Sequence, residues 1–132
     1  MFTLEQIREA HSRVKTGADF PAYIQDMKKL GVQSYKHYVS DGHVDYYGYS
    51  GFALTAAPKW KAVTVAPKGQ KEKLARDIRI HQEGRTDYLT FCRQSAEAGV
   101  EKWVVDMQPM LCSYYDLSGN NMVAEPIPDD GY

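Results

Sequence analysis

The sequence has little of several features that mark specialised classes of protein. Its 132 residues include only two cysteines, Cys92 and Cys112, and these lack the close spacing typical of zinc or redox sites. Basic residues number 16 and acidic residues 17, so no positive excess favours bulk binding to nucleic acid. No apolar run approaches the roughly 18 residues that span a bilayer. We therefore expect a cytoplasmic protein with free thiols and no membrane partner.

The short motifs that identify common enzyme classes are also missing. The chain has no glycine-rich phosphate loop, no Gly-x-Ser-x-Gly elbow and no His-Glu-x-x-His pattern. We expect no cofactor and no metal. The motifs do not establish an enzyme, and the sequence by itself does not name a biochemical function.

The sequence does contain a pattern that occurs twice: two segments of helical periodicity followed by segments of strand periodicity. Apolar residues at helical spacing, bounded by capping residues and glycines, predict four helices, and changes to a period of two predict strands. The helices are expected over residues 4–14, 20–30, 70–83 and 88–98. The strands are expected over 32–39, 43–49, 51–55, 61–66, 100–107, 111–116 and 121–127, followed by a frayed tail at 128–132.

A shift of 68 residues aligns the two halves without a gap from the second helix through the hairpin. Asp19 falls on Asp87, each expected to cap a helix, and Gly31 falls on Gly99, each expected to end one. The aromatic positions that match are Phe20/Tyr88, Tyr23/Phe91, Tyr35/Trp103, Tyr46/Tyr114 and Tyr47/Tyr115. We interpret this agreement as a tandem duplication, with repeats at about 3–66 and 70–127.

The duplication predicts an architecture. A single αα-β-hairpin unit would leave one apolar sheet face and one strand edge unpaired, and two units side by side solve both problems. We expect a single α+β domain over residues 1–132, with an antiparallel or mixed sheet and the helices packed on one face. A pseudo-two-fold relation between the units would create a groove where they meet.

Positions that differ between the halves are the better candidates for function. His37 aligns with Val105, and an imidazole in a semi-apolar setting can supply general acid–base chemistry. The next hairpin adds Asp41, His43 and Asp45, and with His37 these are the candidate catalytic residues. A structural explanation stays open, because Asp-Gly at positions 41–42 is also typical of a tight turn.

Aromatic residues favour a binding function. The chain has ten tyrosines, and aromatic side chains are enriched in the cores of binding interfaces. The candidate binding residues are Tyr35, Tyr38, Tyr46 and Trp103. The favoured hypothesis is a non-catalytic binding protein whose partner is a protein (a second copy, or a host or phage factor) or a small molecule in the inter-repeat groove.

Two alternatives accompany that hypothesis. One is a small enzyme that uses the His/Asp cluster of the first hairpin. The other is weak binding of nucleic acid through the basic residues between Lys68 and Arg79, although such a stretch is more typical of a solvated helix face.

Three segments resemble a known family: residues 17–23 (GADFPAY), 38–43 (YVSDGH) and 99–106 (GVEKWVVD). They are similar to the YdfO/YbcV-like family of uncharacterised bacterial and prophage proteins, some of which carry the label phage envelope protein. The likeness covers nearly the whole chain, from Phe2 to about Pro128. The resemblance implies a bacterial, often phage-derived, soluble protein, and it carries over no catalytic residue.

Overall fold

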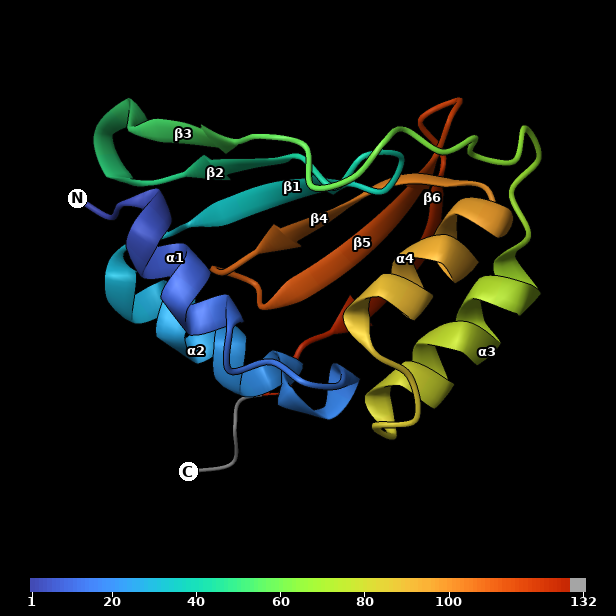
Figure 1. Ribbon diagram of the computed structural model, residues 1–132, viewed down its shortest axis with the longest axis horizontal. Helices are drawn as coiled ribbons and strands as arrows, with labels where there is room; N and C mark the ends of the chain where they lie inside the picture. The colour runs from blue at the N-terminus through green and yellow to red at the C-terminus, as the bar shows by residue number, and fades with distance from the viewer. Residues whose placement is uncertain (129–132) are drawn as a thin grey trace.

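The computed structural model describes residues 1–128, so residues 129–132 of the expected tail lie outside the described residues. Within 1–128 the chain forms four α-helices and a six-stranded antiparallel sheet (Figure 1). The helices are α1 (Leu4–His11), α2 (Phe20–Leu30), α3 (Lys71–Gln82) and α4 (Tyr88–Glu97). Two short 3-10 helices, η1 (Gly17–Asp19) and η2 (Tyr49–Gly51), lie in the first half.

The helix ends follow from local chemistry, with one exception to the expected caps. Asp87 caps α4, because its carboxylate accepts the backbone N–H of Thr90 at 2.8 Å. Asp19 does not cap α2 with its side chain, and that expectation is wrong. Its carboxylate instead accepts the backbone N–H groups of Lys15 and Thr16. The reason is conformational: Asp19 has helical backbone angles, whereas a capping residue is normally extended.

The glycines expected to end helices do so. Gly31 follows α2 with φ of 99°, and Gly99 lies after α4 with φ of 88°. Both angles fall in the left-handed region, which glycine adopts without the steric cost of a Cβ atom. The local stop signals were therefore sufficient to predict where these two helices end.

The strands form one sheet in the order β3-β2-β1-β4-β5-β6, with every neighbouring pair antiparallel. In chain order they are β1 (Ser34–Tyr38), β2 (Val44–Tyr47), β3 (Ala53–Ala56), β4 (Val100–Asp106), β5 (Leu111–Asp116) and β6 (Asn121–Pro126). The central pair is β1 and β4, in which Lys36 lies opposite Val104.

The strand expected at 61–66 does not form, and residues 57–70 connect β3 to α3 without a strand. Backbone groups of this connection donate to the β1–β2 turn and to the end of α4 instead of to a strand edge. The N–H of Val63 donates to the Ser40 carbonyl, and the N–H of Ala66 donates to the Ala96 carbonyl. Alternating apolar residues are therefore not enough for a strand where no strand edge is within reach.

All four helices lie on the same side of the sheet, α1 and α2 at one end and α3 and α4 at the other (Figure 1). The core lies between these layers and includes Tyr35 and His37 from β1 and Trp103 and Val105 from β4. No helix within residues 1–128 is long and apolar enough to cross a membrane.

Candidate functional site

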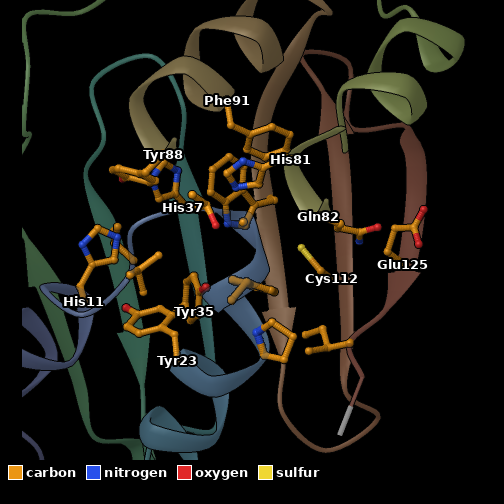
Figure 2. A pocket seen from close by; sticks show the side chains of 18 of the residues that line it. His11, Tyr23, Tyr35, His37, His81, Gln82, Tyr88, Phe91, Cys112 and Glu125 are labelled. Carbon is orange, nitrogen blue, oxygen red and sulfur yellow. The ribbon is translucent and has the colours of Figure 1, made fainter. Parts of the chain in front are cut away.

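A cavity of about 370 Å³ lies between the helices and the sheet, where the two halves of the chain meet. Helices α1, α2, α3 and α4, the 3-10 helix η1 and all six strands contribute side chains to its wall. Figure 2 shows labelled side chains from both halves gathered around it. Most of the wall is apolar or aromatic, so the few polar groups decide its chemistry.

His37 is a deeply buried polar group of the wall, with 4% of its surface exposed. Its imidazole stacks on the indole of Trp103, and its Nε2 shares a hydrogen bond with the hydroxyl of Tyr88. Burial lowers the pKa of His37 well below its usual value, and the nearby charges of Lys59 and His11 add to this effect. His37 is therefore neutral at pH 7. Its Nδ1 has no partner within residues 1–128.

His11 stands beside this pair on α1. Its ring makes edge-to-face contacts with Tyr23 and Tyr88, with ring centroids 5.4 and 4.8 Å apart. Burial, followed by the charge of Lys59, lowers the pKa of His11. Tyr88 therefore contacts both histidines, and Lys59 acts electrostatically on both.

His81 forms another part of the wall, at the end of α3. Its Nδ1 lies 2.9 Å from Oγ1 of Thr86, and its ring stacks on Phe91 with centroids 4.3 Å apart. Burial lowers the pKa of His81. On its other side the chain of the first half approaches closely, since a Cβ atom at Gly17 would lie 2.1 Å from the His81 carbonyl oxygen. This contact joins η1 to α3.

Buried tyrosines cover the sheet side of the cavity. Tyr35, Tyr46 and Tyr114 belong to β1, β2 and β5, and each is less than a tenth exposed. Burial raises the pKa of all three hydroxyls, that of Tyr46 to about 12. These groups therefore stay neutral and can act only as hydrogen-bonding groups.

Formal charge occurs at few positions of the wall. Lys59 donates from Nζ to the Gly42 carbonyl at 2.7 Å, and Arg8 lies one turn before His11 on α1. Glu125 of β6 lies elsewhere and acts electrostatically on Cys112 and Tyr114. Figure 2 places Glu125 and His11 at opposite sides of the cavity.

The expected cluster of the first hairpin is only partly brought together. Oδ1 of Asp41 lies 2.6 Å from Nδ1 of His43, whose ring stacks on Tyr38. Tyr38 follows His37 in β1, and successive side chains of a strand point to opposite faces. His37 therefore faces the helices, while His43 and Asp41 lie toward the other face.

The remaining expected residues divide in the same way. Asp45 accepts a hydrogen bond from the Thr55 hydroxyl at 2.8 Å, away from His37. Among the candidate binding residues, Tyr35, Tyr46 and Trp103 line the cavity. Tyr38 does not, and it lies instead beside the ammonium of Lys102, 5.7 Å from its ring centroid.

Sequence reasoning missed the contribution of Tyr88 and Lys59. Tyr88 aligns with Phe20, so the comparison of the halves contained a signal for it, namely a hydroxyl present in only one half. Lys59 lies in the connection after β3, where no local pattern distinguishes it from other exposed lysines.

The thiols and possible metal ligands offer little chemistry. Cys92 and Cys112 are buried free thiols, and burial raises the pKa of each to about 12. Thiolates, which are the reactive form, are therefore scarce at neutral pH. Among residues 1–128 no group of three or more His, Cys, Asp or Glu side chains is placed to hold a metal ion.

Comparison with known proteins extends over both halves. A family model described as "Protein of unknown function (DUF1398)" matches residues 8–126. No curated protein matches the chain. The match names no chemistry, so the function has to be argued from the cavity.

Proposed function

The chain belongs to the DUF1398 family of proteins of unknown function, and from its cavity we propose that it binds a small molecule with an apolar, ring-containing body. The observation that carries this proposal is the cavity of about 370 Å³ walled by aromatic side chains of both halves. Sites for small molecules typically enclose about 300–1,000 Å³ and combine apolar walls with a few polar groups.

The wall is organised before any ligand arrives. His37 is stacked on Trp103, and His81 is stacked on Phe91, so these flat surfaces are held in place by their neighbours. A site whose side chains are already ordered loses less conformational entropy on binding. The neutral state of the histidines and tyrosines suits the apolar body of a ligand, because covering these side chains strips no ion of its water.

Binding of a neutral fluorescent probe, phenylnaphthylamine, tests the proposal. We expect saturable binding of one probe per chain with quenching of tryptophan fluorescence, because Trp103 lines the cavity. Ala56→Phe on β3 should block binding, since Ala56 lines the cavity. Ala53→Phe on the same strand is the control, because Ala53 is exposed and outside the wall. Equal binding by the two folded variants, or no binding by the native chain, would overturn the proposal.

A second candidate function is acid–base catalysis on the bound molecule. The observation in its favour is the hydrogen bond between Tyr88 and the imidazole of His37 at the cavity wall. Burial lowers the pKa of this imidazole, so it is neutral and can accept a proton. In this version His37 acts with Tyr88, and Asp41, His43 and Asp45 take no part because they face away. Turnover by the native chain that is lost in a folded His37→Gln variant, which still binds the probe, is the result that would support it.

We also propose that the chain arose by tandem duplication of an αα-β-hairpin unit. Lys36 and Val104 are 68 positions apart and lie opposite each other in the β1–β4 pair, as a two-fold axis between two copies would require. The same shift converts the β1–β2 pair Tyr35/Tyr46 into the β4–β5 pair Trp103/Tyr114. A crystal structure in which residues 20–47 and 88–115 fail to superpose would contradict the duplication.

For the origin and location of the chain, we propose a YdfO/YbcV-like, prophage-derived protein of the cytoplasm. Protein partners, including a second copy, would use the face of the sheet opposite the helices, where Tyr38 and Lys102 lie. Nucleic-acid binding has less support, because Lys73 of the basic stretch is paired with Asp77 at 2.7 Å.

A further inference from the structure

We propose that the ligand is an apolar monoanion, with a carboxylate as the simplest anionic group, and that Lys59 receives its charged end. This inference rests on the proposed binding function of the cavity and adds the chemical class of the ligand. Its basis is where the charged side chains Lys59, Arg8 and Glu125 lie on a wall whose histidines and tyrosines are neutral.

Lys59 is a cation of the wall that has no carboxylate partner. Within residues 1–128 no acidic side chain lies within ion-pairing distance of its ammonium, whose one hydrogen bond goes to the Gly42 carbonyl at 2.7 Å. The acid that acts on it electrostatically is Asp41, which is itself bonded to His43 at 2.6 Å. Because an ammonium has three N–H donors, Lys59 keeps donors for a ligand.

The backbone that carries Lys59 is fixed to the β1–β2 turn. The N–H groups of Lys59 and Trp60 both donate to the Asp41 carbonyl, at 2.8 and 3.2 Å. The indole Nε1 of Trp60 donates to the Ser40 carbonyl at 3.0 Å, and its ring covers Gly42 so closely that a Cβ atom there would lie 2.8 Å away. The lysine is therefore presented from an ordered segment, although the connection contains no helix or strand.

The surroundings of Lys59 suit the head of an anion. His11 and His37 both experience its charge, and Tyr88 contacts both histidines, so these groups form one polar corner of the cavity. A carboxylate in this corner would meet one cation and neutral hydrogen-bonding groups, and such charge-assisted hydrogen bonds are stronger than neutral ones. Arg8 supplies a second cation on the wall.

The opposite side of the cavity limits the ligand to a single negative charge. Glu125 lines the wall there and has no ion-pair partner within residues 1–128. A second anionic group at that side would face its carboxylate and be repelled. Between the two ends lie aromatic rings such as Phe91 and Trp103, which an apolar body would cover.

Three compounds with the same body separate charge from apolar contact: phenylbutyrate, phenylbutanol and phenylbutylamine. Each is titrated into the native chain bound to phenylnaphthylamine, and displacement gives its affinity. We expect the carboxylate to bind at least about tenfold more tightly than the alcohol, which is about 1.4 kcal/mol, and also more tightly than the amine, whose cation Lys59 repels.

Variants then assign the preference to Lys59. Lys59→Gln should remove the advantage of the carboxylate while leaving the affinity for the alcohol within about twofold, since the apolar contacts are unchanged. Lys61→Gln is the matched control, because Lys61 is exposed as Lys59 is and lies two positions away, but it does not line the cavity.

Equal affinity for carboxylate and alcohol would overturn the anionic class, and a carboxylate advantage that survives Lys59→Gln would overturn the assignment of the charged end to Lys59. In both cases binding of the alcohol would still uphold the cavity as a binding site. Failure of the probe and of all three compounds to bind would overturn the proposed function and this inference together.

Discussion

The imidazole of His37 lies flat against the indole of Trp103, with ring centroids 4.0 Å apart and planes inclined by 7°. The two residues face each other across the β1–β4 pair, the central contact of the sheet and the place where the halves of the chain join. The stack therefore does two things at once: it packs the junction of the halves and forms part of the cavity wall.

Trp103→Ala should destabilise the fold. Trp103 is 6% exposed and contacts Phe91 and Tyr114 as well as His37, so truncation removes aromatic contacts with α4, β5 and β1. We expect a loss of about 3–5 kcal/mol in the free energy of unfolding, measured by urea denaturation. Leu117→Ala is the control, because Leu117 is 49% exposed and should change stability by less than about 0.5 kcal/mol. A similar loss of unfolding free energy in the two variants would show that the His37–Trp103 stack contributes little to the stability of the fold.

Stability should fall as pH is lowered from 7 to 5. Burial lowers the pKa of His37 in the folded protein, so between its unfolded value near 6.5 and its folded value the unfolded chain binds more protons. Its contribution is fully present above pH 6.5 and is lost as pH falls, by up to about 1.4 kcal/mol per pH unit. The lowered pKa values of His11 and His81 act in the same direction.

Urea denaturation at a series of pH values checks this expectation. His37→Gln should reduce the slope of unfolding free energy against pH, whatever its effect on stability at pH 7. The carboxyl groups with lowered pKa values, such as Asp87 and Asp116, titrate in a more acidic window and should not contribute between pH 7 and 5. An unchanged slope in the variant would contradict the neutral, buried state of His37.

Tyr88→Phe should cost about 1–3 kcal/mol of stability, because it leaves Nε2 of the buried His37 without a hydrogen-bond partner. Steric effects should be small, since Phe20 occupies the aligned position of the first half. Tyr115→Phe is the control on the other face of the sheet, where the ring contacts Lys102 and keeps that contact without the hydroxyl. Thermal unfolding of the two variants measures the difference, and equal stability would refute the importance of the Tyr88 hydrogen bond.

Gly17→Ala should destabilise more than Gly119→Ala. At Gly17 an added Cβ atom would lie 2.1 Å from the His81 carbonyl oxygen, so η1 and α3 must separate. We expect a cost of at least about 3 kcal/mol, at the upper end of overpacking effects, because the clash is with backbone atoms. At Gly119 the φ of 86° penalises alanine by only about 1–2 kcal/mol, and nothing lies within 4 Å. The probe should also bind more weakly to folded Gly17→Ala, because the Gly17–His81 contact closes the cavity wall. Unchanged binding and stability would show that η1 and α3 can move apart at little cost.

The sequence by itself determined most of the secondary structure. Helix ends at Gly31 and Gly99, the cap at Asp87 and the hairpins around Tyr46 and Tyr114 depend on residues close together in the chain. Such signals are local, so they can be read without knowing the fold. The side of the sheet on which His37 lies was also within reach, because side chains alternate along a strand.

Only the tertiary structure decided which side chains form the candidate site. His11, His81 and Tyr88 come from three helices, and Lys59 comes from the connection after β3, in which the sequence predicts a strand at 61–66. Their meeting depends on how the helix pairs pack on the sheet, which is set by contacts between residues far apart in sequence. The hairpin residues His43 and Asp41, although close to His37 in sequence, lie toward the opposite face. Residues close together along a strand need not have side chains that meet, because successive side chains point to opposite faces of the sheet.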